Sequence, residues 1–361
     1  MTLRLHRAPR ADQLAEALGT LLATPPDDPF APELVLVPAR GVERWLSQRL
    51  SHRLGRGDTD DGVCAGVAFR SPRTLVAEVT GLHAEGGDGD PWAADALVWP
   101  LLGVVDASAG EKWCRTLGAH LGHGQTGEEG ELRRGRRYAV ARRLARLFAS
   151  YAVQRPGLLA DWEAGIDSDG VGARIDPDLL WQPELWRRLV AVVGAPSPVV
   201  RHARVLDELR AGPQAADLPA RLSLFGHTRL AVTEVELLAA LGEHRDVHVW
   251  LPHASDALWR SLTGLAGAVP RRDDTSHLQA GHPLLASLGR DLRELERTLL
   301  VHVPMVEPVE TGPVDEDLDK LDHRGSLEPR GSLLSWLQAD IAANATVDPT
   351  GRVLDVDDRS V

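Results

Sequence analysis

The chain of 361 residues carries 40 basic and 52 acidic side chains, which gives a formal net charge of −12, and 43% of its residues are hydrophobic. This balance excludes a wholly disordered chain, and the length predicts two domains or one core with a large insertion. Because the net charge is negative, indiscriminate attraction to nucleic acid is excluded as well. A DNA-binding site therefore requires a local patch of basic residues.

The first ninety residues are predicted to form alternating strands and helices. Short apolar runs indicate strands over residues 3–6, 34–37 and 63–69, and the spacing of leucines and valines indicates helices over 11–22 and 41–54. A further short helix is expected over 72–79. Because strands and helices follow one another in succession, the pattern predicts a parallel sheet covered by helices.

Residues 91–210 have a different character. Six of the ten tryptophans lie there, and the alternation of polar and apolar residues that is typical of strands is scarce. We interpret this block as a helical insertion. The earlier pattern then resumes, with strands over 222–225 and 247–251, a helix over 233–241, a long leucine stripe over 284–299 that predicts one helix, and a last amphipathic helix over 333–341.

The expected domains follow from these changes along the chain. Residues 1–90 form the first part of an α/β core, 91–210 the helical insertion, and 211–305 the second part of the core. An acidic, flexible loop is expected over 306–330, because seven acidic residues and one lysine lie between positions 307 and 322. Residues 331–361 are expected to hold a helix and the start of a further domain, so that the chain is interpreted as a piece of a longer polypeptide.

The lysines exclude two common sites. Lys112 and Lys320 are the only lysines, so 38 of the 40 basic residues are arginines. A Walker A loop needs a lysine that follows a glycine and precedes serine or threonine, because its ammonium group must reach the phosphates. Neither lysine has these neighbours, and neither has a carboxylate two residues before it, as a nuclease motif of the (Asp/Glu)-x-Lys kind requires. The sequence therefore predicts no P-loop and no such nuclease site.

Other candidate sites are weak. Cys64 and Cys114 are predicted to be free thiols in a reducing compartment, and His120 and His123 near Cys114 lack a fourth zinc ligand. We predict no catalytic residue and no metal site. The first residues hold no apolar segment, and the longest apolar run, 97–105, is short and interrupted by a proline, so we expect a cytoplasmic protein outside the membrane.

Two groups of arginines are candidates for DNA contact. Arg40 and Arg44 begin a helix directly after a predicted parallel strand, where ligands bind to such sheets and where free N–H groups face a phosphate. Residues 131–155 hold eight arginines and one glutamate, a local balance of +7, on a helix whose other face is apolar. A merely solvated surface is the alternative interpretation of each group, and composition leaves both open.

A series of spaced motifs extends over nearly the whole chain. They include Leu5-His6, Asp27-Asp28-Pro29-Phe30, Gly41-x-x-x-Trp45-Leu46, Tyr151-x-x-x-Arg155-Pro156-x-Leu158-Leu159-x-x-Trp162, Trp181-Gln182-Pro183-x-Leu185-Trp186 and His282-Pro283-Leu284-Leu285-x-Ser287-Leu288-Gly289-Arg290. With these motifs in this order, the chain resembles the N-terminal third of the RecC family, the gamma subunits of exodeoxyribonuclease V.

The resemblance implies a helicase-like α/β core of the P-loop NTPase type whose ATPase motifs have decayed, with a large helical insertion. It places His6, Arg7, Ala8 and Pro9 at the degenerate ATP site, and Leu224-Phe225-Gly226-His227 where an Asp-Glu pair would hold magnesium. The positions that match the family's DNA-scanning surface are Pro38, Arg40, Arg44, Arg146, Leu147, Arg155 and His202, and Arg142 on the same arginine-rich helix is a further candidate for DNA contact. Better-known members carry small polar and amide residues at the first three positions, whereas guanidinium groups favour guanine or phosphate.

The function implied by the resemblance is that of a DNA-binding, non-catalytic subunit of an ATP-dependent helicase and exonuclease. Such a subunit acts in double-strand-break repair by homologous recombination, splits duplex ends and scans the 3′ single strand for a Chi-like sequence. Its expected partners are a RecB-like helicase-nuclease and a RecD-like helicase in a heterotrimer, and these use ATP and Mg²⁺, while this chain binds no cofactor. The alternatives are a stand-alone α/β phosphotransfer or nucleotide-hydrolysing enzyme, and a protein-interaction scaffold without DNA contact.

Overall fold

The computed structural model describes residues 3–26, 28, 30–55, 62–80, 89–213, 216–265, 267, 269, 272–302 and 332–346. These residues form two compact units. Unit 1 comprises the ranges Met1–Leu75, Gly212–Leu230 and Val235–Val361, and unit 2 comprises Val76–Ala211 and Ala231–Glu234. The predicted acidic loop over 306–330 lies outside the described residues, as do positions 347–361.

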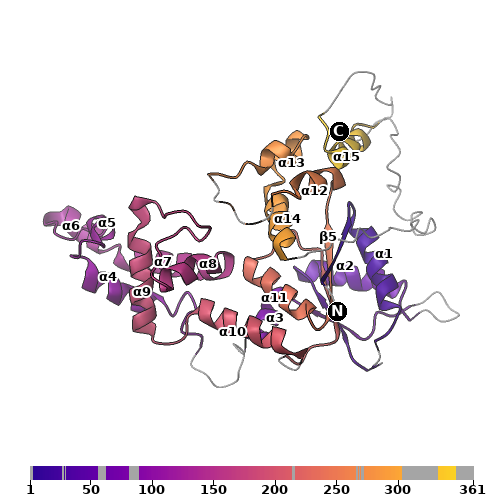
Figure 1. Cartoon of the computed structure of the whole chain (residues 1–361), viewed down its shortest axis with the longest axis horizontal. Coiled ribbons are helices and arrows are strands. Elements are labelled where there is room, and N and C mark those ends of the chain that lie inside the picture. Colours follow the sequence, from indigo (N-terminus) through magenta and orange to yellow (C-terminus); the bar gives the residue numbers. More distant parts are fainter. Residues whose placement is uncertain are drawn as a thin grey trace. The chain divides into compact units, whose positions relative to one another are not determined.

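Unit 1 is built around a parallel sheet of five strands (Figure 1). The strands are β1 (Leu3–Ala8), β2 (Glu33–Leu36), β3 (Val67–Arg70), β4 (Arg221–Phe225) and β5 (Asp246–Pro252), and their order in the sheet is β1-β5-β4-β2-β3. Every neighbouring pair is parallel, so the carboxyl ends of all five strands lie at one edge. The α/β class with a parallel sheet, predicted from the sequence, is confirmed.

Helices connect these strands and cover the sheet. They are α1 (Ala11–Leu22), α2 (Arg40–Ser51), α3 (Pro72–Val79) and α11 (Val232–Gly242). Leu14, Leu18 and Leu22 of α1 pack with Leu46 and Leu50 of α2 against the sheet in one hydrophobic core. The four-residue spacing that predicted these helices therefore reflects the faces that are buried. The third strand is shorter than expected, because Gly66 adopts a φ of +72° just before it.

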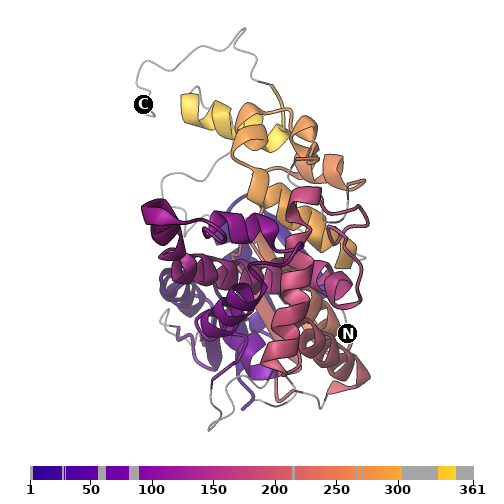
Figure 2. The same cartoon turned by 90° about the vertical axis from the view of Figure 1, so that its left-hand side faces the viewer.

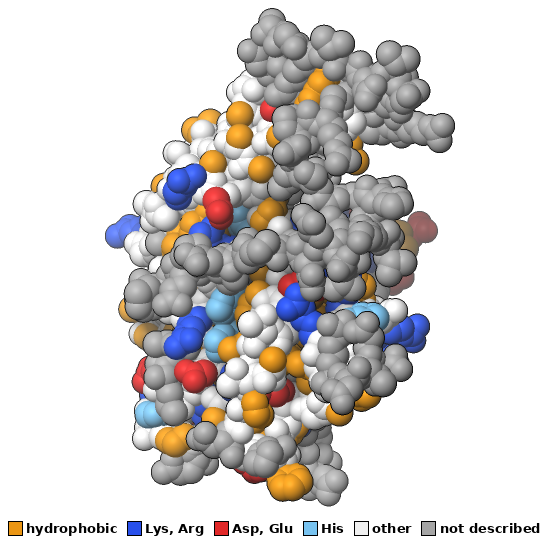
Figure 3. Space-filling model, turned by 90° about the vertical axis from the view of Figure 1, so that its right-hand side faces the viewer, with side chains coloured by type: hydrophobic (Ala, Val, Ile, Leu, Met, Phe, Trp, Pro, Cys, Tyr) orange, Lys and Arg blue, Asp and Glu red, His pale blue; other side chains and the backbone are white. Residues whose placement is uncertain are grey.

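A second group of helices completes unit 1. It comprises α12 (Asp256–Leu262), η3 (Ser276–Gln279), α13 (Pro283–Ser287), α14 (Arg290–His302) and α15 (Leu333–Ala343). Leu258, Leu262 and Leu285 form their small shared core. Hydrophobic side chains are also visible at the surface of this part of unit 1 (Figure 3). The last helix was predicted from the sequence, whereas α12 and η3 were not.

The prediction of one continuous helix over 284–299 is wrong. The structure divides this stretch into α13 and α14, with a turn at Leu288 and Gly289. The Arg293 guanidinium donates a hydrogen bond to the carbonyl of Leu285, which satisfies a carbonyl group left open at the end of α13. Leu288 is 78% exposed although it belongs to the leucine stripe. Leucine spacing thus continues across a short break that the spacing itself does not reveal.

Unit 2 is helical (Figures 1 and 2). Its helices are α4 (Val98–Ser108), α5 (Arg115–His120), α6 (Gly127–Arg134), α7 (Arg137–Gln154), α8 (Pro156–Glu163), η1 (Pro177–Leu179), α9 (Trp181–Val193) and α10 (Pro198–Ala211). Phe148, Trp162 and Trp186 are its largest fully buried side chains, and they pack within one core. In the part of the chain that the structure describes, no single helix is long and apolar enough to cross a membrane, and only the bent pair Pro177–Val193 and Pro198–Ala211 passes that test together.

Candidate nucleic-acid interface

The first group of predicted residues lies on α2 in unit 1. Pro38 and Arg40 are exposed at the carboxyl end of β2, where the backbone of Ala39 is extended and the helix begins. Arg44 is exposed one turn further along. Neither arginine has an ion-pair partner among the described residues. Two uncompensated guanidinium groups therefore face solvent at the edge of a parallel sheet where ligands bind.

The aromatic ring of Trp45 extends this surface. Its side chain is 37% exposed, and its ring lies 6.2 Å from the ring of Phe225 at the carboxyl end of β4. A partly exposed indole beside arginines is able to stack on an unpaired base. The sequence motif contains Trp45, but the spacing of residues gave no indication that its ring faces solvent.

The predicted degenerate ATP site lies at the carboxyl end of β1. His6 stacks on Trp250 at 3.9 Å between ring centroids, and its Nε2 atom lies 2.9 Å from Nδ1 of His248. Burial and the neighbouring His248 lower the pKa of His6 to about 4, so His6 is neutral at pH 7. The side chain of Arg7 is 9% exposed and donates a hydrogen bond to Asp256. Ala8 is buried and Pro9 is exposed.

A histidine occupies the position implied for a magnesium-binding acidic pair. Gly226 and His227 follow β4, and Gly226 has a φ of +72°, a conformation that favours glycine. His227 is buried, and burial lowers its pKa to about 4, so its ring is neutral at pH 7. A neutral imidazole offers a cation one nitrogen, whereas magnesium prefers carboxylate oxygens. The residues present do not fit a magnesium site of that kind.

The second group of predicted residues lies on α7 in unit 2. Arg142 and Arg146 are exposed one turn apart, and Arg143 lies beside them. The opposite side of the helix is buried through Leu144 and Phe148, so the fold itself turns the arginines outward. None of the three guanidinium groups has a partner in the described part of the chain. We call these three residues the arginine ridge.

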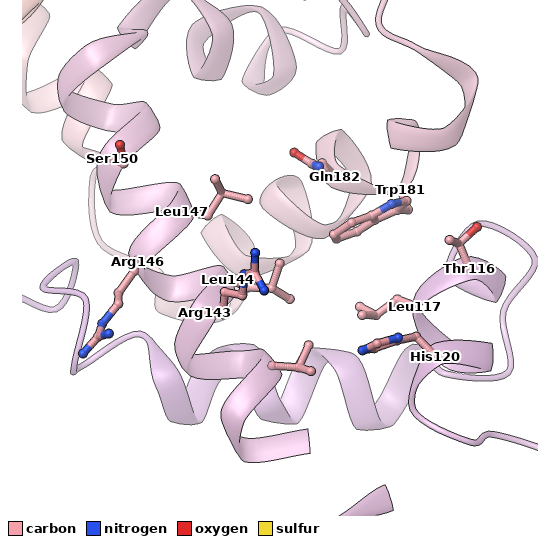
Figure 4. A pocket seen from close by; sticks show the side chains of 11 residues that line it. Thr116, Leu117, His120, Arg143, Leu144, Arg146, Leu147, Ser150, Trp181 and Gln182 are labelled. Atoms are coloured by element: carbon pink, nitrogen blue, oxygen red, sulfur yellow. The ribbon is translucent and has the colours of Figure 1, made fainter. Parts of the chain in front are cut away.

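A cavity of about 670 Å³ lies alongside the arginine ridge. Figure 4 shows its walls, which come from α5, α7 and the first residues of α9. Leu144 and Leu147 line it together with the ring of Trp181, and Arg143 and His120 add polar groups. Of the lining residues, Arg146 and Leu147 are predicted from the sequence as DNA contacts, whereas Arg143, His120 and Trp181 are not. No local sequence pattern identifies these lining residues, because the cavity forms only where three helices meet.

The remaining predicted residues lie at the ends of neighbouring helices. Arg155 is exposed directly after α7 and precedes Pro156, the first residue of α8. His202 is half-buried on α10. The structure therefore places Arg142, Arg146 and Leu147 on one helix with Arg155 at its end, while His202 belongs to another helix. Whether these residues bind DNA stays a prediction.

These observations define the class of the protein. It is an α/β protein with a parallel sheet, and it carries uncompensated arginines at one edge of the sheet and on one helix. The model of the RecC N-terminal domain matches residues 3–344. The RecBCD enzyme subunit RecC of Mycobacterium tuberculosis (strain CDC 1551) is 58% identical over 366 residues, which cover 100% of this chain and 31% of the relative. The chain belongs to the RecC family.

Two further relatives carry the same name. RecBCD enzyme subunit RecC of Mycolicibacterium smegmatis is 55% identical over 361 residues, 100% of this chain and 30% of the relative. That of Escherichia coli K12 is 26% identical over 271 residues, 72% of this chain and 22% of the relative. The chain thus spans about a third of the length of the mycobacterial relatives. The family resemblance inferred from the sequence motifs is confirmed.

Proposed function

We propose that the chain is a DNA-contacting, non-catalytic part of a RecC-type subunit, within a RecBCD-type helicase-nuclease that acts in DNA repair and recombination. The observation that carries this proposal is the arginine ridge of α7, whose three guanidinium groups are exposed without partners among the described residues. An exposed positive surface attracts a phosphate backbone and releases its counterions. Membership in the RecC family supplies the setting.

The arginines on α2 and α7 act as positioning contacts on a single DNA strand. Guanidinium groups pair with phosphate or with the O6 and N7 atoms of guanine, so the chain tracks the sugar-phosphate backbone of the 3′ strand and favours guanine where it reads bases. Trp45 adds a stacking surface on α2. In this proposal the subunit splits duplex ends and scans the 3′ strand for a Chi-like sequence, while RecB-like and RecD-like partners translocate and cut the DNA.

We further propose that unit 1 is a degenerate, helicase-like core and that unit 2 is its helical insertion. Three observations support this assignment. The sequence lacks a P-loop lysine, and Arg7 at the carboxyl end of β1 is paired with Asp256 instead of being open to a phosphate. His227, rather than a carboxylate, follows β4. ATP and Mg²⁺ are then used by the partner subunits, and this cytoplasmic chain hydrolyses no ATP, in contrast to a stand-alone phosphotransfer enzyme.

The experiment compares two double variants in single-strand binding. Arg142→Ala with Arg146→Ala removes two uncompensated charges, whereas Arg137→Ala with Arg204→Ala removes two charges that are paired with Asp106 and Glu208. We expect the first variant to bind an oligonucleotide more weakly and to reduce the slope of log K against log salt by about 1.4. The control variant should retain most of the affinity, because its arginines are already neutralised.

The measurement is fluorescence anisotropy of a labelled oligonucleotide over a range of salt concentrations. Equal salt slopes for the two variants and the unchanged chain would contradict the proposal. That outcome favours the alternative of an interaction scaffold without DNA contact, for which the exposed aromatic pair Trp99 and Tyr138, 5.7 Å apart, is the candidate surface.

A further inference from the structure

A compact group of polar residues lies in unit 1 at the carboxyl ends of β1 and β5. The two strands pair in parallel, and the N–H of His253, just after β5, donates a hydrogen bond of 2.9 Å to the carbonyl of Ala8 at the end of β1. Arg7 comes from β1, Trp259 from α12 and Glu296 from α14. In parallel sheets this edge is the place where ligands bind, and here the chain's own helices cover it.

Arg7 is the centre of this group. Its side chain is 9% exposed, its Nε atom is buried and has no partner within the described residues, and its guanidinium lies 4.3 Å from the ring of Trp259. Burial lowers the pKa of Arg7 although Asp256 favours its charged form. A guanidinium that has lost its water requires an anion beside it, because a buried, uncompensated charge is costly.

Glu296 does not supply this anion. It is fully buried, its Oε2 atom lies 3.3 Å from Nε2 of His253, and its Oε1 atom has no partner among the residues described. Burial raises the pKa of Glu296 to about 9, so its carboxyl group is protonated at pH 7. The backbone N–H of Ser255 donates to Nδ1 of His253, which leaves the imidazole proton on Nε2 to donate to Glu296.

Asp256 is the anion that remains. Its Oδ1 atom accepts a hydrogen bond of 2.7 Å from Nη1 of Arg7, and its side chain is 70% exposed. The buried guanidinium is thus paired with an exposed carboxylate at the start of the neighbouring α12. A carboxylate and a phosphate present similar oxygen acceptors to a guanidinium.

We propose that Arg7 forms an anion-binding position for a phosphate group at this edge of the sheet, and that Asp256 occupies this position as an internal carboxylate ligand. In the unchanged chain the position is therefore closed to phosphate. Removal of the Asp256 carboxylate opens it, because the guanidinium keeps its place against Trp259 and its Nη1 atom, which Asp256 engages in the unchanged chain, becomes available to a phosphate oxygen. This inference concerns a ligand site in unit 1 and is independent of the DNA contacts proposed above.

The test is the thermal unfolding of the whole chain in inorganic phosphate against chloride at equal ionic strength and pH 7. We expect Asp256→Ala to unfold at a temperature higher by about 5 °C at saturating phosphate, with a shift that grows with the logarithm of concentration. The unchanged chain should show no such shift. A parallel series with ADP distinguishes a free phosphate from one carried by a nucleotide, and a shift with either ligand supports the proposal.

Two controls make the result specific. Asp106→Ala also breaks an arginine–aspartate pair, at 3.0 Å to Arg137, but that arginine is half exposed, so no phosphate effect is expected. Arg7→Met in the Asp256→Ala chain should abolish the shift. The proposal is overturned if neither ligand raises the unfolding temperature of folded Asp256→Ala, or if the rise in unfolding temperature persists without Arg7. Should Asp256→Ala not fold, Asp256→Ser, whose shorter side chain carries no carboxylate, is measured under the same criteria.

Discussion

Arg297 and Arg142, one from each unit, play opposite roles. Arg297 in unit 1 is 8% exposed along its side chain and donates to the carbonyls of Leu265 and Gly267, both at 2.7 Å, and to Asp274 at 3.1 Å. Arg142 on α7 of unit 2 is exposed and has no partner in the described residues. The same side chain thus holds a fold together in one place and leaves a charge open for a ligand in the other.

A count of arginines therefore does not identify a binding surface. A buried guanidinium whose donors are all directed at carbonyls and carboxylates has no capacity for a phosphate, whereas an exposed one on a rigid helix retains it. The neighbours that the fold supplies decide whether an arginine is able to bind a phosphate.

The largest effect is expected from Arg297→Met. The change leaves the Asp274 carboxylate and two carbonyl groups without their partner inside unit 1, and breaking a buried pair in this way costs about 3 kcal/mol or more. Arg142→Met, the matched change on α7, should alter stability by no more than about 0.5 kcal/mol. Urea unfolding followed by circular dichroism measures both. Similar losses for the two variants would contradict the distinction between buried and open arginines.

A smaller effect, visible through pH, is expected from Glu296→Gln. The pKa of Glu296 is raised to about 9 in the folded chain, above its ordinary value of 4.5. The contribution of the protonated Glu296 carboxyl group to the free energy of unfolding is therefore fully present below pH 4.5. It is lost as pH rises toward 9, because the unfolded chain releases the proton first. The variant should gain stability relative to the unchanged chain as pH rises, by an amount on the order of 1 kcal/mol between pH 7 and 8.

This measurement is made between pH 7 and 9. His253, the neighbour of Glu296, has a pKa lowered to about 4 by burial, so it is neutral in the folded chain throughout that window, and its titration in the unfolded chain is the same with and without the substitution. Glutamine keeps an oxygen that accepts the hydrogen bond from His253. Parallel stability curves for the variant and the unchanged chain over this range would show that Glu296 is ionised in the folded protein.

Much of the fold was predictable from local patterns, whereas the partners of polar side chains were not. The leucines of α1 mark the bounds 11–22, and the buried run of β4 is evident as a strand, because both signals lie within a few residues. Arg7 and Asp256 are 249 positions apart, so no local pattern connects them. The break at Gly289 was missed for the opposite reason, since leucine spacing continues across it.

The candidate interface shows the same difference between features that local sequence predicts and features that depend on contacts between distant residues. The charge of residues 131–155 predicted an arginine-rich helix, and α7 with its outward arginines has that form. The cavity beside it was not predictable, because Trp181 and His120 reach it from α9 and α5. Local composition therefore indicated which helix carries charge. Only the packing of three helices shows that a cavity lies beside the charged face of α7.

The smallest effect is expected from Gly41→Ala at the start of α2. An added methyl group would meet no atom within 4 Å, and alanine favours the helix, so stability should rise by about 0.5 kcal/mol. Single-strand affinity should fall a few-fold if a phosphate approaches the free N–H groups between Arg40 and Arg44, because the methyl group would stand between them. We expect this combination of higher stability and weaker binding, measured by urea unfolding and fluorescence anisotropy. Unchanged affinity would confine the contact to the guanidinium groups, and α2 would then bind DNA as the ridge on α7 is proposed to do, through side chains alone.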